Sequence, residues 1–529
     1  MAERLGLAAL AAALLGLVVL PLLDLFGTAL SAGAGAALES LRGVAGEAML
    51  TTLLIGLAVT AGSLAVGALA AFATERENVP GRGWLRVGML MPLLVPGFVS
   101  ALSWIGAYGP GGLAHDLFGF ELPGLFGAPG VVAVLVVETV PITYLVIAGA
   151  LAAHGEPDAE RAARAAGAGR WGTLRSVTLP LLAPALAAAA VLAFVSAVNA
   201  FGVPAILGTP ARLVTVTVRI YQDLALSADP AAFVRATVLA SVLVLLAVVT
   251  VSAADALFST GRAVRTGAPS GPMPAGRRGR LVAGALWLYL VLAVVLPLVA
   301  LGLASITRAV GLPPLPEYWT LDNYGAALTG RTASALGNSA LLAATGATAA
   351  VLLGSLLAAL RAGRLRRGLS VAAALPFAVP GSALAVAVLL AYGPWLRDTL
   401  LLIGIAYLAK FWALGHRSLV GAADGLAGAP LQAARASGAT RLDALRSIVL
   451  PLMRPALLGA WLAVFVLALH ELTMSSLLHG PGSQTLAVVI LNLQQLGDVP
   501  TTSALAVVLT LVGLVAGGTF LLVGRRAPA

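Results

Sequence analysis

Residues Arg161 to Leu186 read RAARAAGAGRWGTLRSVTLPLLAPAL, and residues Gln432 to Leu457 read QAARASGATRLDALRSIVLPLMRPAL. The second stretch repeats the first without a gap, and 16 of their 26 paired positions are identical. Each is among the longest polar runs of a very apolar chain. A repeated polar segment that carries arginines between hydrophobic blocks indicates a contact with a partner outside a lipid bilayer.

The composition indicates a polytopic helical membrane protein. The 529 residues are 60% hydrophobic and 10% charged, whereas a soluble domain carries about 25% charged residues. Apolar stretches of about 20 residues recur along the chain, which is the length of a helix that crosses a bilayer. The chain has no cysteine, which excludes disulfides and thiolate metal sites.

These stretches predict an all-α polytopic membrane fold of about 12 transmembrane helices, six in each half. The predicted spans are 5–23, 49–73, 85–108, 130–152, 181–201, 233–256, 281–305, 337–360, 369–392, 399–420, 453–473 and 503–523. The first span follows Arg4 and lacks a clear small-residue cleavage site, so we interpret it as a retained span and not as a signal peptide. Residues 259–280 are rich in Gly, Pro and Arg and predict a cytoplasmic linker between a first repeat, 1–258, and a second repeat, 281–529.

The distribution of basic residues predicts that both termini are cytoplasmic. In that orientation 24 of the 32 Lys and Arg residues are cytoplasmic and 6 lie outside, while Arg235 and Lys410 fall within or at the ends of spans. Such a bias over mostly short loops is a topology signal, so it needs no nucleic-acid partner. It puts both copies of the repeated polar stretch in the cytoplasm.

The two halves match beyond the polar stretch. Pro92, Pro96 and Gly97 of the first half recur with the same spacing as Pro376, Pro380 and Gly381 in the second. The tetrapeptide Ala-Tyr-Gly-Pro at 107–110 recurs at 391–394 in the same register. Because six spans are an even number, both halves keep the same orientation and form parallel repeats.

The residues of the polar stretch predict a short helix outside the bilayer, followed by a turn and re-entry. Ala162 and Ala163 favour a helix and have almost no side chain, which lets the helix enter a groove on a partner. Gly167 sits where such a helix can end. Pro180 then opens the next span, since proline is tolerated in a first helical turn.

This pattern resembles the coupling-loop signature of ABC importer permeases of the binding-protein-dependent type, which reads Glu-Ala-Ala, then Gly, then Leu-Pro. The spacing from Gly167 to Pro180 equals the spacing from Gly438 to Pro451. The resemblance covers nearly the whole chain, as two permease domains of the type I importer fold fused in series. The coupling residues that it implies are Glu160, Arg161, Ala162, Ala163, Arg164, Gly167, Pro180, Gln432, Ala433, Ala434, Arg435, Gly438 and Pro451. The family's glutamate position is held here by Arg161 and Gln432, with Glu160 next to the first.

The resemblance also implies the partners and the location. Each loop would dock in a cleft of one of two ATPase subunits on the cytoplasmic side, and a substrate-binding protein would dock on the outside of a bacterial inner membrane. The chain has no Gly-x4-Gly-Lys-Ser/Thr phosphate loop, so ATP would be bound by the separate ATPase subunits. We expect no catalytic, cofactor or metal site in this chain.

Three alternatives compete with this interpretation. Ordinary cytoplasmic loops explain one Ala-rich helix, but two copies at fixed spacing in the same topological position favour coupling loops. A secondary transporter with six-plus-six repeats needs acidic residues within its spans, where Glu138 is nearly alone. A membrane-embedded enzyme needs clustered His, Asp or Ser side chains at one depth, and the sequence does not group them.

The substrate clues are weaker. Fused double permeases of this length resemble the ferric iron permease group, with relatives for thiamine and aminoethylphosphonate. The segments Phe201–Gln222 and His470–Asp498 resemble the iron-type group, so iron(III) is the predicted cargo and the other two are the alternatives. Glu138 is a possible pathway residue because an ionisable group at membrane depth is commonly functional, and an interhelical hydrogen bond is the simpler explanation. His470 and Glu471, at the end of span 11, allow the same two interpretations.

Overall fold

The computed structural model of the chain describes residues 2–153, 157–258, 273–274, 276–359, 368–370, 372, 379–426, 434 and 436–525. Almost all of these residues are helical, and the short segments η are 3-10 or π turns. The first half contains α1 (Ala2–Leu14), η1 (Leu15–Val19), α2 (Leu20–Ser31), α3 (Gly33–Ser40), α4 (Val44–Glu75), α5 (Arg82–Leu90), η2 (Met91–Leu94), α6 (Gly97–Tyr108), α7 (Leu113–Phe118), α8 (Ala128–Ala153), α9 (Pro157–Ala165), α10 (Arg170–Thr173), η3 (Leu174–Thr178), α11 (Leu179–Asn199), η4 (Pro204–Gly208), η5 (Thr209–Ala211), α12 (Val216–Tyr221), η6 (Gln222–Leu226) and α13 (Pro230–Phe258).

The second half repeats this order. It contains α14 (Arg277–Leu290), η7 (Val291–Val295), α15 (Leu296–Ile306), η8 (Pro316–Tyr318), α16 (Asp322–Ala327), α17 (Gly330–Ala358), α19 (Gly381–Leu396), α20 (Leu400–Leu426), α22 (Arg441–Ala444), η9 (Leu445–Val449), α23 (Leu450–Leu469), α24 (Thr473–Leu478), α25 (Leu486–Gln495) and α26 (Val499–Arg525). The short strands β1 (Glu77–Asn78) and β2 (Met273–Pro274) pair in parallel. Apart from 273–274 and 276–280, the predicted linker lies outside the described residues.

Ten helices among the described residues are long and apolar enough to cross a membrane, and they correspond to ten of the twelve predicted spans. The third span of each half differs. In the first half it is two helices, Arg82–Leu94 and Gly97–Phe118, bent by 107°. In the second half Gly381–Leu396 is a shorter apolar helix, and much of 360–378 lies outside the described residues. The bend in the first half and the start of Gly381–Leu396 in the second both occur at a Val-Pro-Gly sequence, because a residue before proline is driven to extended backbone.

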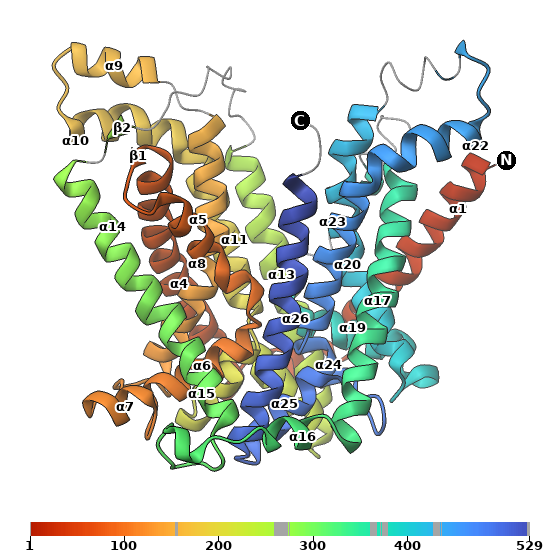
Figure 1. Cartoon of the computed structure of the whole chain (residues 1–529). Coiled ribbons are helices and arrows are strands. Elements are labelled where there is room, and N and C mark those ends of the chain that lie inside the picture. Colours follow the sequence, from red (N-terminus) through yellow and green to blue (C-terminus); the bar gives the residue numbers. More distant parts are fainter. Residues whose placement is uncertain are drawn as a thin grey trace.

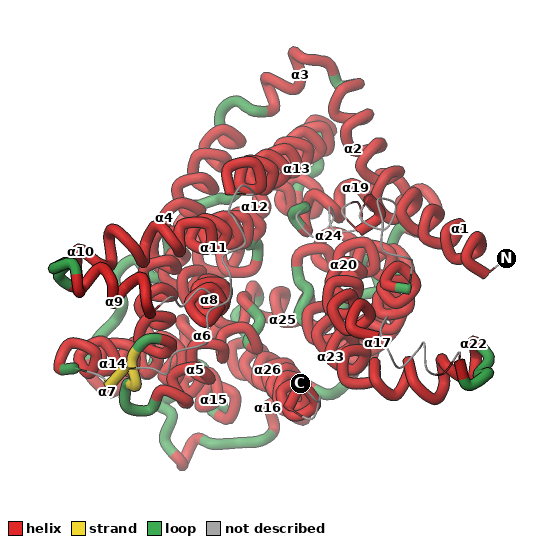
Figure 2. The backbone as a smooth tube through the Cα atoms, turned by 90° about the horizontal axis from the view of Figure 1, so that it is seen from above, coloured by secondary structure: helices red, strands yellow, loops and turns green. Residues whose placement is uncertain are grey.

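The first span of each half packs on the opposite half. The α1–α2 span contacts α17, α19 and α20 of the second half, while the α14–α15 span contacts α4, α5 and α6 of the first half. Figure 2 shows both spans at the rim, beside helices far away in the sequence. The two halves therefore exchange their first spans, each of which packs against helices of the other half.

The exchanged spans are each fixed by a tyrosine and a π turn. The Tyr392 hydroxyl donates to the Gly16 carbonyl in η1, 2.6 Å away, and the Tyr108 hydroxyl donates to the Leu292 carbonyl in η7, 2.5 Å away. Trp104 Nε1 also donates to the Ala293 carbonyl at 3.2 Å. A π turn leaves carbonyls of its helix without the usual backbone donor, and these side chains supply one.

Close packing inside each half depends on glycine. Gly67 of α4 and Gly354 of α17 each face the backbone of the helix that pairs with their own, α8 or α20. A Cβ at Gly67 would lie 3.0 Å from the Tyr144 amide nitrogen, and a Cβ at Gly354 would lie 2.6 Å from the His416 amide nitrogen. Small residues at such crossings let helices approach closely in lipid, where dispersion contacts provide most of the stabilisation.

Candidate functional site

The two copies of the repeated polar stretch lie at the same end of the molecule. Helices α9 and α10 stand at one upper corner of Figure 1 and α22 at the other, beyond the bundle of long helices. The N-terminal end of α1 and the C-terminal end of α26 lie at this end too, while α7, α16 and α25 lie at the opposite end. This arrangement agrees with parallel repeats, in which equivalent loops share one side.

Both polar loops contain the same turn. Gly167 and Gly438 have left-handed φ values of +87° and +81°, which side chains other than glycine rarely adopt. The Ala168 N–H donates to the Ala163 carbonyl at 2.9 Å, and the Ala439 N–H donates to the Ala434 carbonyl at 3.0 Å. A bond of this span with a left-handed glycine is the Schellman end of a helix, so the identical residues of the two loops produce identical turns.

Re-entry into the bundle is also the same in both loops. The π turns η3 and η9 stand directly before Leu-Pro, and Pro180 and Pro451 occupy the first turn of α11 and α23. The Ser176 and Ser447 hydroxyls donate to carbonyls one helical turn earlier at 2.7 and 2.5 Å. Proline has no backbone N–H, so Pro180 and Pro451 cannot donate the usual α-helical hydrogen bond. The wider π turn directly before each of them is consistent with that missing donor.

Glu160 holds the first loop against the bundle. Its carboxylate accepts a hydrogen bond from the Thr178 hydroxyl at 3.0 Å and lies 3.3 Å from a nitrogen of Arg76 at the end of α4 and 3.3 Å from a nitrogen of Arg164. The side chain is 14% exposed. Glu160 therefore joins α9, η3 and α4, and this role was not visible in the sequence because its partners are distant along the chain.

The loops differ in how their second helix begins. In the second loop Thr440 and Asp443 form a reciprocal cap, with each backbone N–H donating to the other's side chain at 3.2 Å. The first loop has Gly169 and Gly172 at these positions. Of the predicted loop residues, Gln432, Ala433 and Arg435 lie outside the described residues, as does the side chain of Arg161.

Each loop also presents a large apolar side chain that the sequence interpretation did not single out. Trp171 is 71% exposed on α10, and Leu442 is 52% exposed on α22. They are paired positions of the repeat, each directly after an arginine. Both side chains stand at the first residue of a candidate membrane span, Trp171–Asn199 or Leu442–Leu469, next to the polar loop.

Glu138 lies in the middle of α8, and its Oε1 is buried with no hydrogen-bond partner among the described residues. The carboxylate rests on Gly97, where a Cβ would overlap Oε1. Gly97 is the first residue of α6, directly after the break in the third span. The structure thus gives Glu138 no interhelical hydrogen bond within the described chain.

His470 and Glu471 lie between α23 and α24, and both are half-buried. Glu471 caps α24, since its carboxylate accepts bonds from the Met474 and Ser475 backbone N–H groups at 2.9 and 3.1 Å. His470 Nε2 is buried without a partner among the described residues, beside Gly513 of α26. No group of three His, Cys, Asp or Glu side chains in the described ranges could hold a metal ion.

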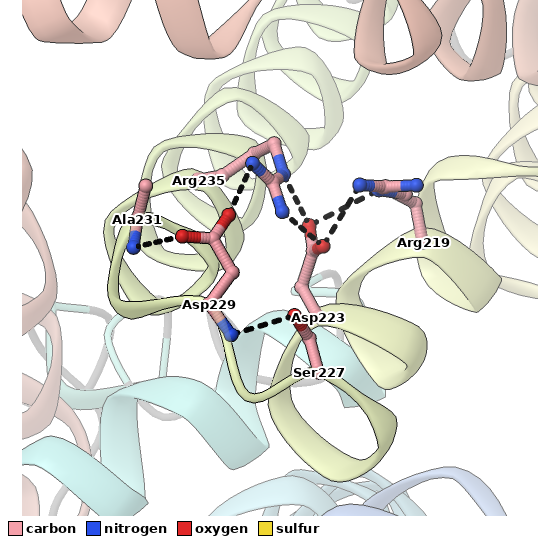
Figure 3. Close-up of polar contacts among 6 residues, drawn as sticks. All are labelled: Arg219, Asp223, Ser227, Asp229, Ala231 and Arg235. Atoms are coloured by element: carbon pink, nitrogen blue, oxygen red, sulfur yellow. Dashed lines mark hydrogen bonds and ion pairs between the residues drawn. The ribbon is translucent and has the colours of Figure 1, made fainter.

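An ionic cluster lies at the end opposite the polar loops, and the sequence interpretation missed it (Figure 3). The Asp223 carboxylate, 1% exposed, accepts bonds from Arg235 at 2.9 and 2.7 Å and one from Arg219 at 3.2 Å. Asp229 lies 3.6 Å from Arg235. The cluster ties η6 to α13. The nearest sequence signal was Arg235, a charge at the start of an apolar span.

Comparison with known proteins identifies a family whose model matches the chain twice. Residues 63–259 and 350–527 each match the family described as "Binding-protein-dependent transport system inner membrane component". The chain is similar to the "Probable ABC transporter permease protein y4fN" of Sinorhizobium fredii, with 27% identity over 84% of this chain and 81% of the relative.

Two relatives carry substrate names. The "Fe(3+)-transport system permease protein FbpB 2" of Haemophilus influenzae is 24% identical over 84% of this chain and 83% of its own length. The "Putrescine transport system permease protein PotI" of Escherichia coli is 31% identical over 34% of this chain and 69% of its own length.

Proposed function

This chain belongs to the binding-protein-dependent transport system inner membrane component family and is an ABC importer permease subunit; from that premise we propose that its halves enclose one translocation pathway, coupled to two separate ATPase subunits by the two polar loops. The observation that carries the proposal is the pair of loops with the same left-handed glycine turn, π turn and Leu-Pro re-entry. Two equal docking elements at one end suit two equal ATPase subunits.

The remaining assignments follow from this arrangement. The loops and both chain ends face the cytoplasm of a bacterial inner membrane, which the Lys and Arg distribution supports. A substrate-binding protein docks at the opposite end, where the Asp223 cluster stiffens η6 and α13. The ATPase subunits bind the ATP, and the chain itself carries no catalytic activity.

We propose iron(III) as the cargo. The iron-transport relative supports it because that similarity runs through both halves of the chain. A polyamine is the second candidate, since the putrescine permease relative has the higher identity over a shorter region. Thiamine and aminoethylphosphonate are the other two candidate substrates, and the experiment below includes their binding proteins.

The test is ATP hydrolysis by the full chain reconstituted with its ATPase subunits, with and without each loaded binding protein. We expect one loaded protein to stimulate hydrolysis, and Gly167→Trp and Gly438→Trp each to abolish the stimulation. Gly33→Trp is the matched control, because Gly33 has φ +81° and open space around it but lies at the start of α3. Failure of an ATPase to co-purify with the wild-type chain would overturn the proposal.

A further inference from the structure

The third-span helices α6 and α19 of the two halves begin at the same sequence with the same backbone geometry, and we call each of these places a break. Val95-Pro96-Gly97 precedes α6, and Val379-Pro380-Gly381 precedes α19. Pro96 has φ −58° and ψ 140°, and Pro380 has φ −53° and ψ 138°. The two breaks are therefore equivalent places in the two repeats, and their surroundings can be compared directly.

The helix that packs beside each break carries a charged residue at an equivalent position. Gly67 faces the Tyr144 amide and Gly354 faces the His416 amide, which aligns α8 with α20 so that Tyr144 pairs with His416. The same register pairs Glu138 of the first half with Lys410 of the second. An acidic side chain therefore lies beside the first break and a basic side chain beside the second.

In the second half both a lysine and a glutamate meet the Val379-Pro380-Gly381 sequence. Lys410 Nζ donates to the Val379 carbonyl at this place, and a Cβ on Gly381 would lie 3.6 Å from Glu471 Oε1. Glu471 is itself held by backbone N–H groups of α24. The lysine, the Val379 carbonyl and the glutamate therefore all lie around the second break.

In the first half the acid is present and the cation is missing among the described residues. Glu138 rests on Gly97, with Oε1 buried and unpartnered. Ala200 stands where the repeat places Glu471, so the start of α6 is met by the Glu138 carboxyl group without the lysine that meets the start of α19. A buried carboxyl oxygen without a hydrogen-bond partner is costly, and ionisable groups at membrane depth commonly mark a substrate or ion pathway.

The first break also lies on the boundary between the halves. A Cβ on Gly513 of α26 would lie 2.9 Å from the Leu94 carbonyl oxygen and 2.9 Å from His470 Nε2, and Gly517 packs against the Leu94 side chain. A pathway between the halves must pass this boundary. Glu138 lies beside the break and retains part of its surface, so it is placed to meet a passing ion.

We propose that Glu138, at the Val95-Pro96-Gly97 break, forms a cation subsite of the translocation pathway, which takes in transit the positive charge that Lys410 supplies permanently in the other half. The inference rests on the proposed importer function and specifies its substrate class as a cation. Because no three ligating side chains gather within the described ranges, the subsite attracts the cation by charge without chelating it. Weak attraction suits a site that must release its ligand.

The experiment measures uptake into proteoliposomes that contain the full chain and its ATPase subunits. Two cations are presented in separate arms, iron(III) and putrescine, each on its own binding protein, with aminoethylphosphonate as the anionic arm. The variants are Glu138→Gln, which keeps the shape and removes the charge, and Glu138→Asp, which keeps the charge and shortens the side chain. Thr139→Val is the control, because Thr139 is buried on the same helix and bonds only within it, to the Leu135 carbonyl.

We expect Glu138→Gln to lower cation uptake about tenfold, the effect of removing one charged partner, and Glu138→Asp to retain most of it. A purely structural role predicts the reverse order, with Gln tolerated and Asp harmful, and that result would overturn the subsite. Uptake of aminoethylphosphonate by the wild type, unaffected by Glu138→Gln, would overturn it too. If no binding protein supports uptake by the wild type, the proposed importer function is contradicted, and the subsite with it. A Glu138 variant that still co-purifies with the ATPase is folded, so a loss of uptake confined to that variant concerns the subsite.

Discussion

The hydroxyl of Tyr108 in the first half donates a hydrogen bond to the carbonyl of Leu292 in the second half, 2.5 Å away. Its counterpart runs in the other direction, from Tyr392 to Gly16. Each bond joins a helix of one half to the π turn of a span that arrives from the other half. The two halves are thus held together at two equivalent points, each near a third-span helix that begins at a break.

Tyr108→Phe and Tyr392→Phe test this connection. Each removes one donor from a π-turn carbonyl, so we expect each to lower the free energy of unfolding by about 1–2 kcal/mol. Thermal unfolding of the detergent-solubilised chain measures it. Tyr289→Phe is the control, because the Tyr289 hydroxyl is buried without a partner among the described residues and its loss should not destabilise the protein. Equal effects of all three variants would contradict the assignment.

Trp171→Ala and Leu442→Ala test the exposed side chains of the two polar loops. If these side chains are buried against the ATPase subunits, each truncation removes about 1–3 kcal/mol of apolar contact, and the affinity for the ATPase falls about fivefold to 100-fold. Titration of purified ATPase onto the permease in nanodiscs measures the affinity. Trp395→Ala is the matched control, since Trp395 is 77% exposed on α19, remote from the loops. Unchanged affinity in both loop variants would exclude a contact of these side chains with the ATPase subunits.

Glu160→Gln tests the anchor of the first loop. The change removes the charge facing Arg76 and Arg164 but leaves an acceptor for Thr178, so we expect α9 to open more easily by about 1 kcal/mol or less. Hydrogen exchange of the α9 amides reports this directly. Glu39→Gln on α3 changes the same charge at an exposed site and should leave α9 unaffected. Protection of α9 that is identical in wild type and Glu160→Gln would remove Glu160 as an anchor.

Asp223→Asn tests the ionic cluster at the opposite end. The change leaves Arg219 and Arg235 facing each other without a carboxylate in a largely buried place, and breaking such a pair costs about 3–5 kcal/mol. Asp229→Asn removes a half-exposed partner 3.6 Å from Arg235, and we expect a loss of about 1 kcal/mol or less. Denaturant unfolding of both variants measures the difference. A smaller loss for Asp223 than for Asp229 would be inconsistent with the buried position of Asp223.

The sequence sufficed for the long helices and for the polar loops. Apolar runs of bilayer length have one stable solution in lipid, so ten predicted spans match ten long helices among the described residues. The glycine of the polar stretch was predicted to end a helix, and the left-handed φ values of Gly167 and Gly438 confirm it. Both cases depend on local composition, which one sequence records fully.

The remaining features depend on contacts between distant segments. Nothing near Tyr108 in the sequence identifies Leu292 as its partner, and the exchange of the first spans was therefore not predicted. The third span of the first half was predicted as one span, 85–108, whereas the structure divides it into two helices bent by 107°. The equivalence of Glu138 and Lys410 was hidden as well, because the register between the halves shifts along the chain and only the packing of α8 and α20 aligns these two residues.

The exchange of first spans also orders events during synthesis. Gly16 and the residue that holds it, Tyr392, are 376 positions apart. At about 5–20 residues per second, a ribosome needs roughly 20–75 s to reach the second residue after the first. During that time the first span lacks its contacts with α17, α19 and α20, so this chain reaches its final arrangement only after most of it has been translated.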